Sequence, residues 1–233
     1  MLPQSDIEKL MKGIVEGPMS PSMGLERLLQ LVGWFAQYYL NGEDYQARAI
    51  DHCMSYPPDA VVVLSGPWDE SGDVPKVDSL ENIKRIAFAA WFREVIAPGR
   101  TTHTPFVLNG ETEQLPWMFE EALKHVREDD IVLVDCGARG IANTATQFDV
   151  LAPLGYKRLV TGTTDYHVAR AFLTALERLP GANCTVVGVP YSEFPFDVTT
   201  TLIGEFRRIL EYADRGDIAS ERELQMLFPC PVG

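Results

Sequence analysis

A histidine and an arginine three positions apart are the residues of this chain that most directly suggest chemistry. Thr163, Thr164, His167 and Arg170 follow a short apolar run and precede a helical pattern. Positions three apart lie on one side of a helix, so His167 and Arg170 would project together near its positive end. A histidine titrates near neutral pH, and an arginine binds carboxylate or phosphate through two parallel hydrogen bonds. The segment predicts an anion-binding site with a proton carrier; a local ion pair between Arg170 and an acid such as Asp135 is the alternative.

Glycines and polar side chains also follow the other apolar runs of the chain. We expect catalytic roles for His167, Glu111 and Asp135, because a carboxylate can orient a histidine, bind ribose hydroxyls or bind a cationic group. The residues expected to contact a ligand are Ser65, Gly66, Trp68, Arg85, Asn109, Gly110, Glu113, Asn143, Thr144, Thr163, Thr164 and Arg170. Trp68 could stack on an aromatic ligand or fold over the site. Glycine and polar residues are also common in turns for purely structural reasons.

Several common catalytic motifs do not occur in the sequence. It contains no G-x-G-x-x-G loop of dinucleotide-binding proteins and no phosphate-binding G-x-x-x-x-G-K-[ST] loop. It also contains no G-x-S-x-G nucleophile turn and no zinc-binding H-E-x-x-H pattern. Asp165 and His167 could belong to a metal site, but the sequence offers no identifiable third ligand, so we expect no metal.

Five short apolar runs, rich in β-branched residues, alternate with helical patterns after residue 57. The runs span residues 60–64, 105–108, 131–134, 158–161 and 185–189, and the helical patterns span 83–95, 116–127, 142–154, 167–179 and 202–213. Because the runs are nearly continuous rather than alternating, they indicate strands covered on both faces, as in a parallel sheet. We predict a three-layer αβα, Rossmann-like, doubly wound parallel sheet of about five strands. In such folds ligands bind beyond the carboxyl ends of the strands.

The sequence pattern of the first 57 residues is helical. Apolar residues recur at helical spacing over 25–39, and shorter helical patterns span 7–15 and 44–54. An apolar stripe must be buried against something, most simply against the rest of the chain. We therefore expect residues 1–57 to form an N-terminal helical cap packed on the α/β domain of residues 58–233.

Length and charge limit the class of protein. The chain has 233 residues with 20 basic and 33 acidic side chains, so its formal charge is 20 − 33 = −13. A nucleic-acid surface needs clustered Lys and Arg, so nucleic acid is not expected as a partner. No apolar run is long enough to span a membrane, and the first residues lack a signal-peptide pattern. We expect a soluble cytoplasmic protein; its oligomeric state stays open.

The segment Thr161–Ala171, TGTTDYHVARA, resembles the VTS-x-x-H-x-x-R-A segment of the YdcF–SanA–ElyC family, whose biochemical function is unassigned. Further matches, in the same order along the chain, are Arg85, Val107–Glu113, Asp135, Asn143–Thr144 and Glu205–Tyr212. The similar region covers about residues 58–216. The chain departs from the family at Gln147, often an asparagine, and at Asn109–Glu111, where the family has Ser-Gly-Gly. The resemblance implies the soluble YdcF branch, whose members are described as binding S-adenosylmethionine.

These observations favour a protein that binds an anionic or nucleotide-like small molecule, as an enzyme of the group-transfer or hydrolysis type. Arg170 and Arg85 would hold the anion, and His167 would act as general acid or base. Two alternatives stay open: a sensor that binds the ligand without catalysis, and an S-adenosylmethionine-binding protein or transferase.

Overall fold

The computed structural model describes residues 42–68, 76, 78–97, 104–140, 143–190, 193–195 and 198–218. The apolar stripe at 25–39 and the helix predicted at 7–15 lie outside these residues. The third helix predicted for the cap is present as α3 (Gly42–Ser55). It lies against the last strand, where Tyr45 Oη donates to the carbonyl of Val186 (3.0 Å) and Gln46 Nε2 to that of Gly188 (3.1 Å).

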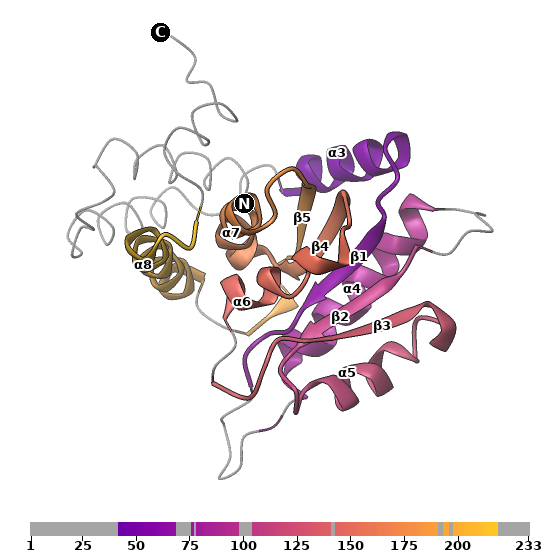
Figure 1. Ribbon diagram of the computed structural model, residues 1–233, viewed down its shortest axis with the longest axis horizontal. Coiled ribbons are helices and arrows are strands. Elements are labelled where there is room, and N and C mark those ends of the chain that lie inside the picture. Colours follow the sequence, from indigo (N-terminus) through magenta and orange to yellow (C-terminus); the bar gives the residue numbers. More distant parts are fainter. Residues whose placement is uncertain are drawn as a thin grey trace, which may run out of the picture.

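All five predicted strands are present and form one parallel sheet. They are β1 (Ala60–Leu64), β2 (Phe106–Gly110), β3 (Ile131–Asp135), β4 (Arg158–Thr164) and β5 (Asn183–Val189). Their order is β3-β2-β1-β4-β5, and every neighbouring pair is parallel (Figure 1). The predicted three-layer α/β fold is therefore confirmed.

The helices between the strands agree with the predicted pattern except at their ends. They are α4 (Leu80–Ile96), α5 (Leu115–Ala122), α6 (Thr144–Asp149), α7 (Val168–Arg178) and α8 (Val198–Arg215), with 3₁₀ turns η1 (Glu128–Asp130), η2 (Ala152–Leu154) and η3 (Asp165–His167). The helix expected over 116–127 ends at Ala122, and the one expected over 142–154 divides into α6 and η2. None of the helices in the described part of the chain combines the length and apolar character needed to cross a membrane.

The helices cover both faces of the sheet. On one face α3, α4 and α5 pack against alternate strand residues such as Val61, Val63 and Leu108. On the other face α6, α7 and α8 pack against Val62, Leu64 and their neighbours. The central strands β1 and β2 are thus buried from both sides, as their sequence pattern predicts, whereas the edge strand β3 is partly exposed.

The direction in which the chain adds strands to the sheet reverses between β1 and β4. The chain proceeds from β1 to β2 and β3 on one side, then returns to place β4 on the other side of β1. At such a switch point the loops diverge beyond the carboxyl ends and leave a crevice between them. The loops after β1 and β4 therefore flank the position where the fold itself predicts a ligand.

Gly188 lets the segment after β4 approach β5. A Cβ atom at this position would lie 2.4 Å from Asp165 Cα and 2.6 Å from Asp165 N. Only glycine leaves room for backbone at that distance. The close contact fixes η3, the turn that carries His167, against the sheet.

Candidate functional site

A cavity of about 450 Å³ lies beyond the carboxyl ends of the strands, at the switch point between β1 and β4. Its walls come from the loop after β1, the end of β2, α6, η3, α7 and α8. The lining residues are Ser65, Gly66, Pro67, Trp68, Arg85, Glu111, Gln114, Asn143, Thr144, Gln147, Tyr166, His167, Arg170, Arg208, Glu211, Tyr212 and Arg215. Nine of them are residues predicted from the sequence to act or bind, and the structure brings those nine together: Ser65, Gly66, Trp68, Arg85, Glu111, Asn143, Thr144, His167 and Arg170.

His167 lies at the floor of the cavity and is only 4% exposed. Its Nδ1 is 2.8 Å from the hydroxyl of Thr163, and its Nε2 is 3.1 Å from the hydroxyl of Thr144. Burial, together with the charges of Arg170, Arg85 and Arg208, lowers the pKa of His167 well below 6.5. The imidazole is therefore neutral at neutral pH, with both ring nitrogens engaged by hydroxyls.

The hydroxyl of Thr144 links the histidine to the arginine. Arg170 Nη1 donates to Thr144 Oγ1 at 2.7 Å. Because a guanidinium can only donate, this oxygen accepts from Arg170. In the tautomer with the ring proton on Nδ1, Thr144 donates its own proton to His167 Nε2, and Nδ1 donates to Thr163. The backbone N–H of Thr144 donates to the Tyr212 hydroxyl (3.2 Å), which fixes the residue from the opposite side.

Arg170 is paired with Glu205 of α8, not with Asp135. Its Nε and Nη2 donate to the two carboxylate oxygens of Glu205 at 2.5 and 3.3 Å. Glu205 has no exposed side-chain surface, and it also accepts from Arg208 Nη1 at 3.0 Å. Burial acts to lower the pKa of Arg170, but the Glu205 carboxylate overcomes it and raises that pKa. The alternative prediction was an ion pair between Arg170 and a local acid such as Asp135. Arg170 does form an ion pair, but its partner is Glu205 on another helix, α8.

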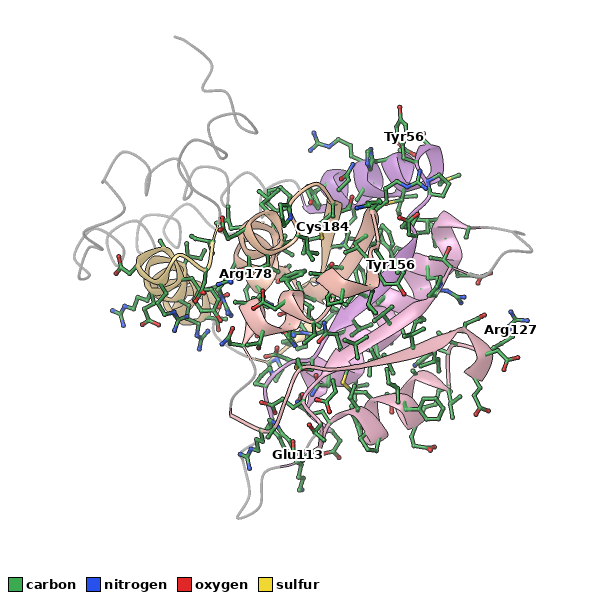
Figure 2. The ribbon with its side chains drawn as sticks, viewed as in Figure 1. Tyr56, Glu113, Arg127, Tyr156, Arg178 and Cys184 are labelled. Carbon is green, nitrogen blue, oxygen red and sulfur yellow. The ribbon has the colours of Figure 1, made fainter. Side chains whose placement is uncertain are left out.

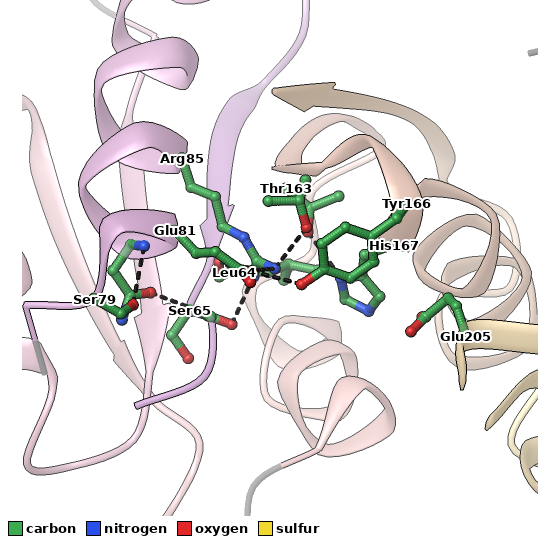
Figure 3. Close-up of polar contacts among 12 residues, drawn as sticks. Leu64, Ser65, Ser79, Glu81, Arg85, Thr163, Tyr166, His167 and Glu205 are labelled. Carbon is green, nitrogen blue, oxygen red and sulfur yellow. Dashed lines mark hydrogen bonds and ion pairs between the residues drawn. The ribbon is translucent and has the colours of Figure 1, made fainter. Parts of the chain in front are cut away.

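Arg85 is held by backbone and side-chain oxygens around the end of β1 (Figure 3). Its Nη1 donates to the carbonyls of Leu64 (3.1 Å) and Ser65 (2.9 Å). Its Nη2 donates to Glu81 Oε2 (3.1 Å) and Thr164 Oγ1 (2.9 Å). The guanidinium lines the cavity but is already bonded at both terminal nitrogens, so its main effect is to fasten the loop after β1 to β4.

Four of the predicted ligand contacts, Asn109, Gly110, Thr163 and Thr164, instead support the walls of the cavity, Thr163 through its bond to His167. Asn109 is fully buried and donates from Nδ2 to the carbonyl of Gln147 at 2.6 Å. Gly110 leaves room for packing, because a Cβ there would lie 2.8 Å from Met118 Sδ and 3.2 Å from Ser65 Cβ. Thr164 is fully buried. These residues lie behind the lining rather than in it.

Asn143 lines the cavity but also caps α6. Its Oδ1 accepts from the backbone N–H groups of Ala145 (2.9 Å) and Thr146 (3.2 Å), and its own N–H donates to Thr146 Oγ1 (2.8 Å). This reciprocal capping box fixes the first turn of the helix. Thr144, the next residue, is thereby held over His167.

Trp68, in the loop after β1, lines the cavity and is positioned by Glu111. Its indole Nε1 donates to Glu111 Oε2, and the other carboxylate oxygen accepts from the N–H of Gly140 at 2.9 Å. The guanidinium of Arg139 lies 4.7 Å from the centre of the Trp68 ring. Glu111 therefore acts on the site through Trp68, with both of its oxygens occupied.

Asp135 and Glu113 lie outside the cavity. Asp135 is exposed at the end of the edge strand β3, where it accepts from Thr112 Oγ1 (2.9 Å) and the N–H of Gly137 (2.8 Å). Glu113 accepts from the N–H of Arg139 at 3.1 Å and lies at the tip of the loop region in Figure 2. The strand order places both at the β3 side of the sheet, away from His167.

The lining residues that the sequence did not single out come mainly from α8. Arg208, Glu211, Tyr212 and Arg215 recur at helical spacing on this helix, and the side chains of Arg208 and Arg215 are 54% and 53% exposed. Glu205, one turn earlier, is the signal that could have identified this face, since a carboxylate on an apolar helical stripe needs a cationic partner. Pro67, Gln114, Gln147 and Tyr166 are the other lining residues that were missed.

Among the described residues, no group of three or more His, Cys, Asp or Glu side chains is placed to hold a metal ion. Searches of protein-family models, curated proteins and solved structures found no match to the chain.

Proposed function

We propose that the cavity binds a small molecule that carries a phosphate or a similar anionic group, and that the protein catalyses group transfer or hydrolysis on it. One observation carries this proposal: a neutral, buried histidine and an arginine share the hydroxyl of Thr144 at the floor of an arginine-lined cavity. The neutral imidazole is suited to accept a proton, and the arginines are suited to neutralise an anion.

The charges around α8 support anion binding. Arg170 and Arg208 share the single carboxylate of Glu205, so this cluster has one positive charge in excess. Arg208 is half-exposed and has further N–H groups directed to solvent or ligand. Arginine donors of this kind bind phosphate through two parallel hydrogen bonds. Arg208 is therefore the side chain we assign to first contact with the anion.

The wall formed by Trp68 supports a ligand with a planar group. The Trp68 ring lines the cavity, and its orientation is fixed by Glu111 at the indole N–H. A fixed indole face favours stacking of an aromatic ring. An anion near α8 and a planar group near Trp68 together describe a nucleotide-like ligand.

Membership of the YdcF–SanA–ElyC family remains our inference from the sequence pattern. S-adenosylmethionine remains an alternative ligand, but Glu111, a candidate for its ribose hydroxyls, already has both carboxylate oxygens bonded. A non-catalytic sensor would use the same cavity. Binding measurements and a product assay distinguish these alternatives.

Calorimetry with inorganic phosphate, AMP and S-adenosylmethionine tests the proposal. Phosphate and AMP should bind, and Arg208→Met should weaken both by roughly one to two decades, since a charged hydrogen bond is worth about 1.5–3 kcal/mol. Arg127→Met is the matched control, because this exposed arginine lies at the opposite end of the strands (Figure 2). Binding of neither anion, or equal losses in the two variants, would refute anion binding in this cavity. A product assay on any ligand found then separates an enzyme from a sensor.

A further inference from the structure

Thr144 has the surroundings of an activated nucleophile. Its Oγ1 lies 3.1 Å from His167 Nε2 and 2.7 Å from Arg170 Nη1. A hydroxyl has one proton and two lone pairs. In the His167 tautomer with the proton on Nδ1, the Thr144 proton is directed to Nε2 and one lone pair accepts from Arg170, so one lone pair remains free, and Thr144 lines the cavity.

The histidine beside it is oriented as a base. Thr163 is fully buried in β4 and holds Nδ1 at 2.8 Å, which turns Nε2 toward Thr144. A nucleophile, a base within hydrogen-bond reach and a third group that orients the base form the arrangement of covalent hydrolases. Here a threonine hydroxyl occupies the orienting position, where a carboxylate is usual.

Ser65 is the other hydroxyl that could compete for this role. It lines the cavity, but its Oγ accepts from Gln147 Nε2 at 3.0 Å. Both ring nitrogens of His167 are taken by Thr144 and Thr163. Ser65 therefore has no base, whereas Thr144 has both a base and a cation.

We infer that Thr144 is the nucleophile of a phosphate-ester hydrolase that works through a phosphothreonine intermediate. The inference rests on the proposed function, because it takes the anion in the cavity to be the phosphate that reacts. A phosphate fits better than an acyl group, since Arg170 bonds Thr144 directly and Arg208 lines the same cavity, and arginines neutralise the charged oxygens of a transferring phosphoryl group.

The reaction has two balanced steps. In the first, Thr144 Oγ attacks phosphorus, the bond from phosphorus to the leaving oxygen breaks, and the hydroxyl proton passes through His167 Nε2 to that oxygen. In the second, water attacks the phosphothreonine, His167 takes a water proton, the bond from phosphorus to Oγ breaks, and the proton returns to Oγ. One water is consumed, an alcohol and inorganic phosphate leave, and the protein is regenerated.

The test uses p-nitrophenyl phosphate as the probe on the full chain. Samples are quenched during turnover, in acid and separately in base, and the modified peptide is located by mass spectrometry. Phosphothreonine survives acid, whereas a phosphohistidine is lost in acid and kept in base. We expect the phosphoryl group on Thr144 in both quenches, with release of p-nitrophenolate.

Variants separate chemistry from folding. Thr144→Val should abolish the adduct and lower hydrolysis by at least about a thousandfold. Thr144→Ser keeps the hydroxyl and should form a phosphoserine at the same position. Thr112→Val is the control, because this hydroxyl bonds Asp135 outside the cavity and its loss should change neither adduct nor rate. Thermal melting of each variant confirms that it is folded.

The outcomes distinguish this inference from the proposed function. An adduct on His167 or Ser65, or undiminished hydrolysis by Thr144→Val, would overturn the role of Thr144. Phosphate binding in calorimetry without any hydrolysis or adduct would overturn it as well and leave anion binding intact. Absence of phosphate binding would refute the proposed function itself.

Discussion

Three arginines at this site have three different roles. Arg85 is bonded to carbonyls and fastens a loop, Arg170 is neutralised by a buried carboxylate, and Arg208 is half-exposed at the cavity. The sequence predicted that Arg85 and Arg170 would be near the ligand, and both line the cavity. It could not predict their hydrogen-bond partners, because Glu205 and Thr164 reach them only through the tertiary fold.

The pairing of Glu205 with Arg170 has a direct energetic consequence. Glu205→Gln removes the charge that compensates Arg170 but keeps the side-chain shape. We expect a loss of about 3 kcal/mol in the free energy of unfolding, the lower end for breaking a buried pair, because the amide retains a hydrogen bond. Urea unfolding measures it. Glu193→Gln, in the exposed pair with Lys84, should cost less than about 1 kcal/mol, and equal losses would contradict the argument.

The low basicity of His167 predicts how stability varies with pH. Its pKa is lower in the folded state than in the unfolded state, so below pH 6.5 the unfolded chain binds a proton that the folded chain does not. The stability contribution is therefore present above pH 6.5 and is lost as the pH falls, by up to about 1.4 kcal/mol per pH unit.

Urea unfolding at pH 7.5 and 5.5 checks this dependence. His167→Gln should lose less stability than the unmodified protein over this interval, because it no longer carries the titrating group. His52→Gln changes an exposed histidine on α3 and should leave the dependence unchanged. A steeper acid loss in His167→Gln would contradict a depressed pKa.

At the scale of elements, the sequence was most informative about strands. Short runs rich in β-branched residues identified all five, and β1 and β2 are buried at every residue as such runs predict, whereas the edge strand β3 leaves Leu133 exposed. Helix ends were less well predicted. The segment expected as one helix over 142–154 contains Pro153, which has no N–H for the fourth carbonyl before it, and α6 ends at Asp149.

Apart from Glu205, the local pattern of α8 gave no signal that this helix contributes to the site. Its apolar stripe indicated a buried face, and Ile209 and Tyr212 do pack in the core. The polar residues flanking that stripe resemble the solvated side of any surface helix. Only the packing of α8 beside η3 and α7 turns Arg208 and Arg215 into cavity walls.

Two glycines give opposite predictions for the same substitution. Gly188→Ala places a methyl group within 2.4 Å of the Asp165 backbone, so η3 must move. We expect a loss of about 1–3 kcal/mol, typical of overpacking, with weaker phosphate binding because His167 moves too.

Gly204→Ala is the matched control within α8. Within the described part of the chain, no atom apart from the helix backbone and the neighbouring residues lies within 4 Å of a Cβ built at this position, and alanine favours a helix interior over glycine by about 0.5–1 kcal/mol. Differential scanning calorimetry should therefore show a lower melting temperature for Gly188→Ala and a higher one for Gly204→Ala. A tolerated Gly188→Ala would mean that the contact with η3 is not fixed.

At the scale of the whole molecule, the positive side chains of the cavity contrast with the negative net charge of the chain. The chain has a formal net charge of −13, yet Arg170, Arg208 and Arg215 all line the cavity. Arg170 is paired with Glu205 and Arg215 with Asp217. The overall charge repels extended polyanions, while the half-exposed Arg208, which shares Glu205 with Arg170, attracts a single small anion at short range. At physiological ionic strength the screening length is about 8 Å, so an arginine still attracts an anion that lies closer than this distance.

This contrast predicts selectivity between a mononucleotide and a nucleic acid. AMP at 100 times its dissociation constant should raise the free energy of unfolding by about 2.7 kcal/mol, because it binds only the folded cavity. A thymidine oligonucleotide at the same phosphate concentration should give no comparable stabilisation, since most of its phosphates would lie against an acidic surface. Thermal unfolding in about 0.15 M salt measures both. Arg208→Met should reduce the effect of AMP at fixed concentration and leave the oligonucleotide result unchanged. Stabilisation by the oligonucleotide as large as that by AMP would contradict a cavity that takes single anions, and would indicate an extended basic surface instead.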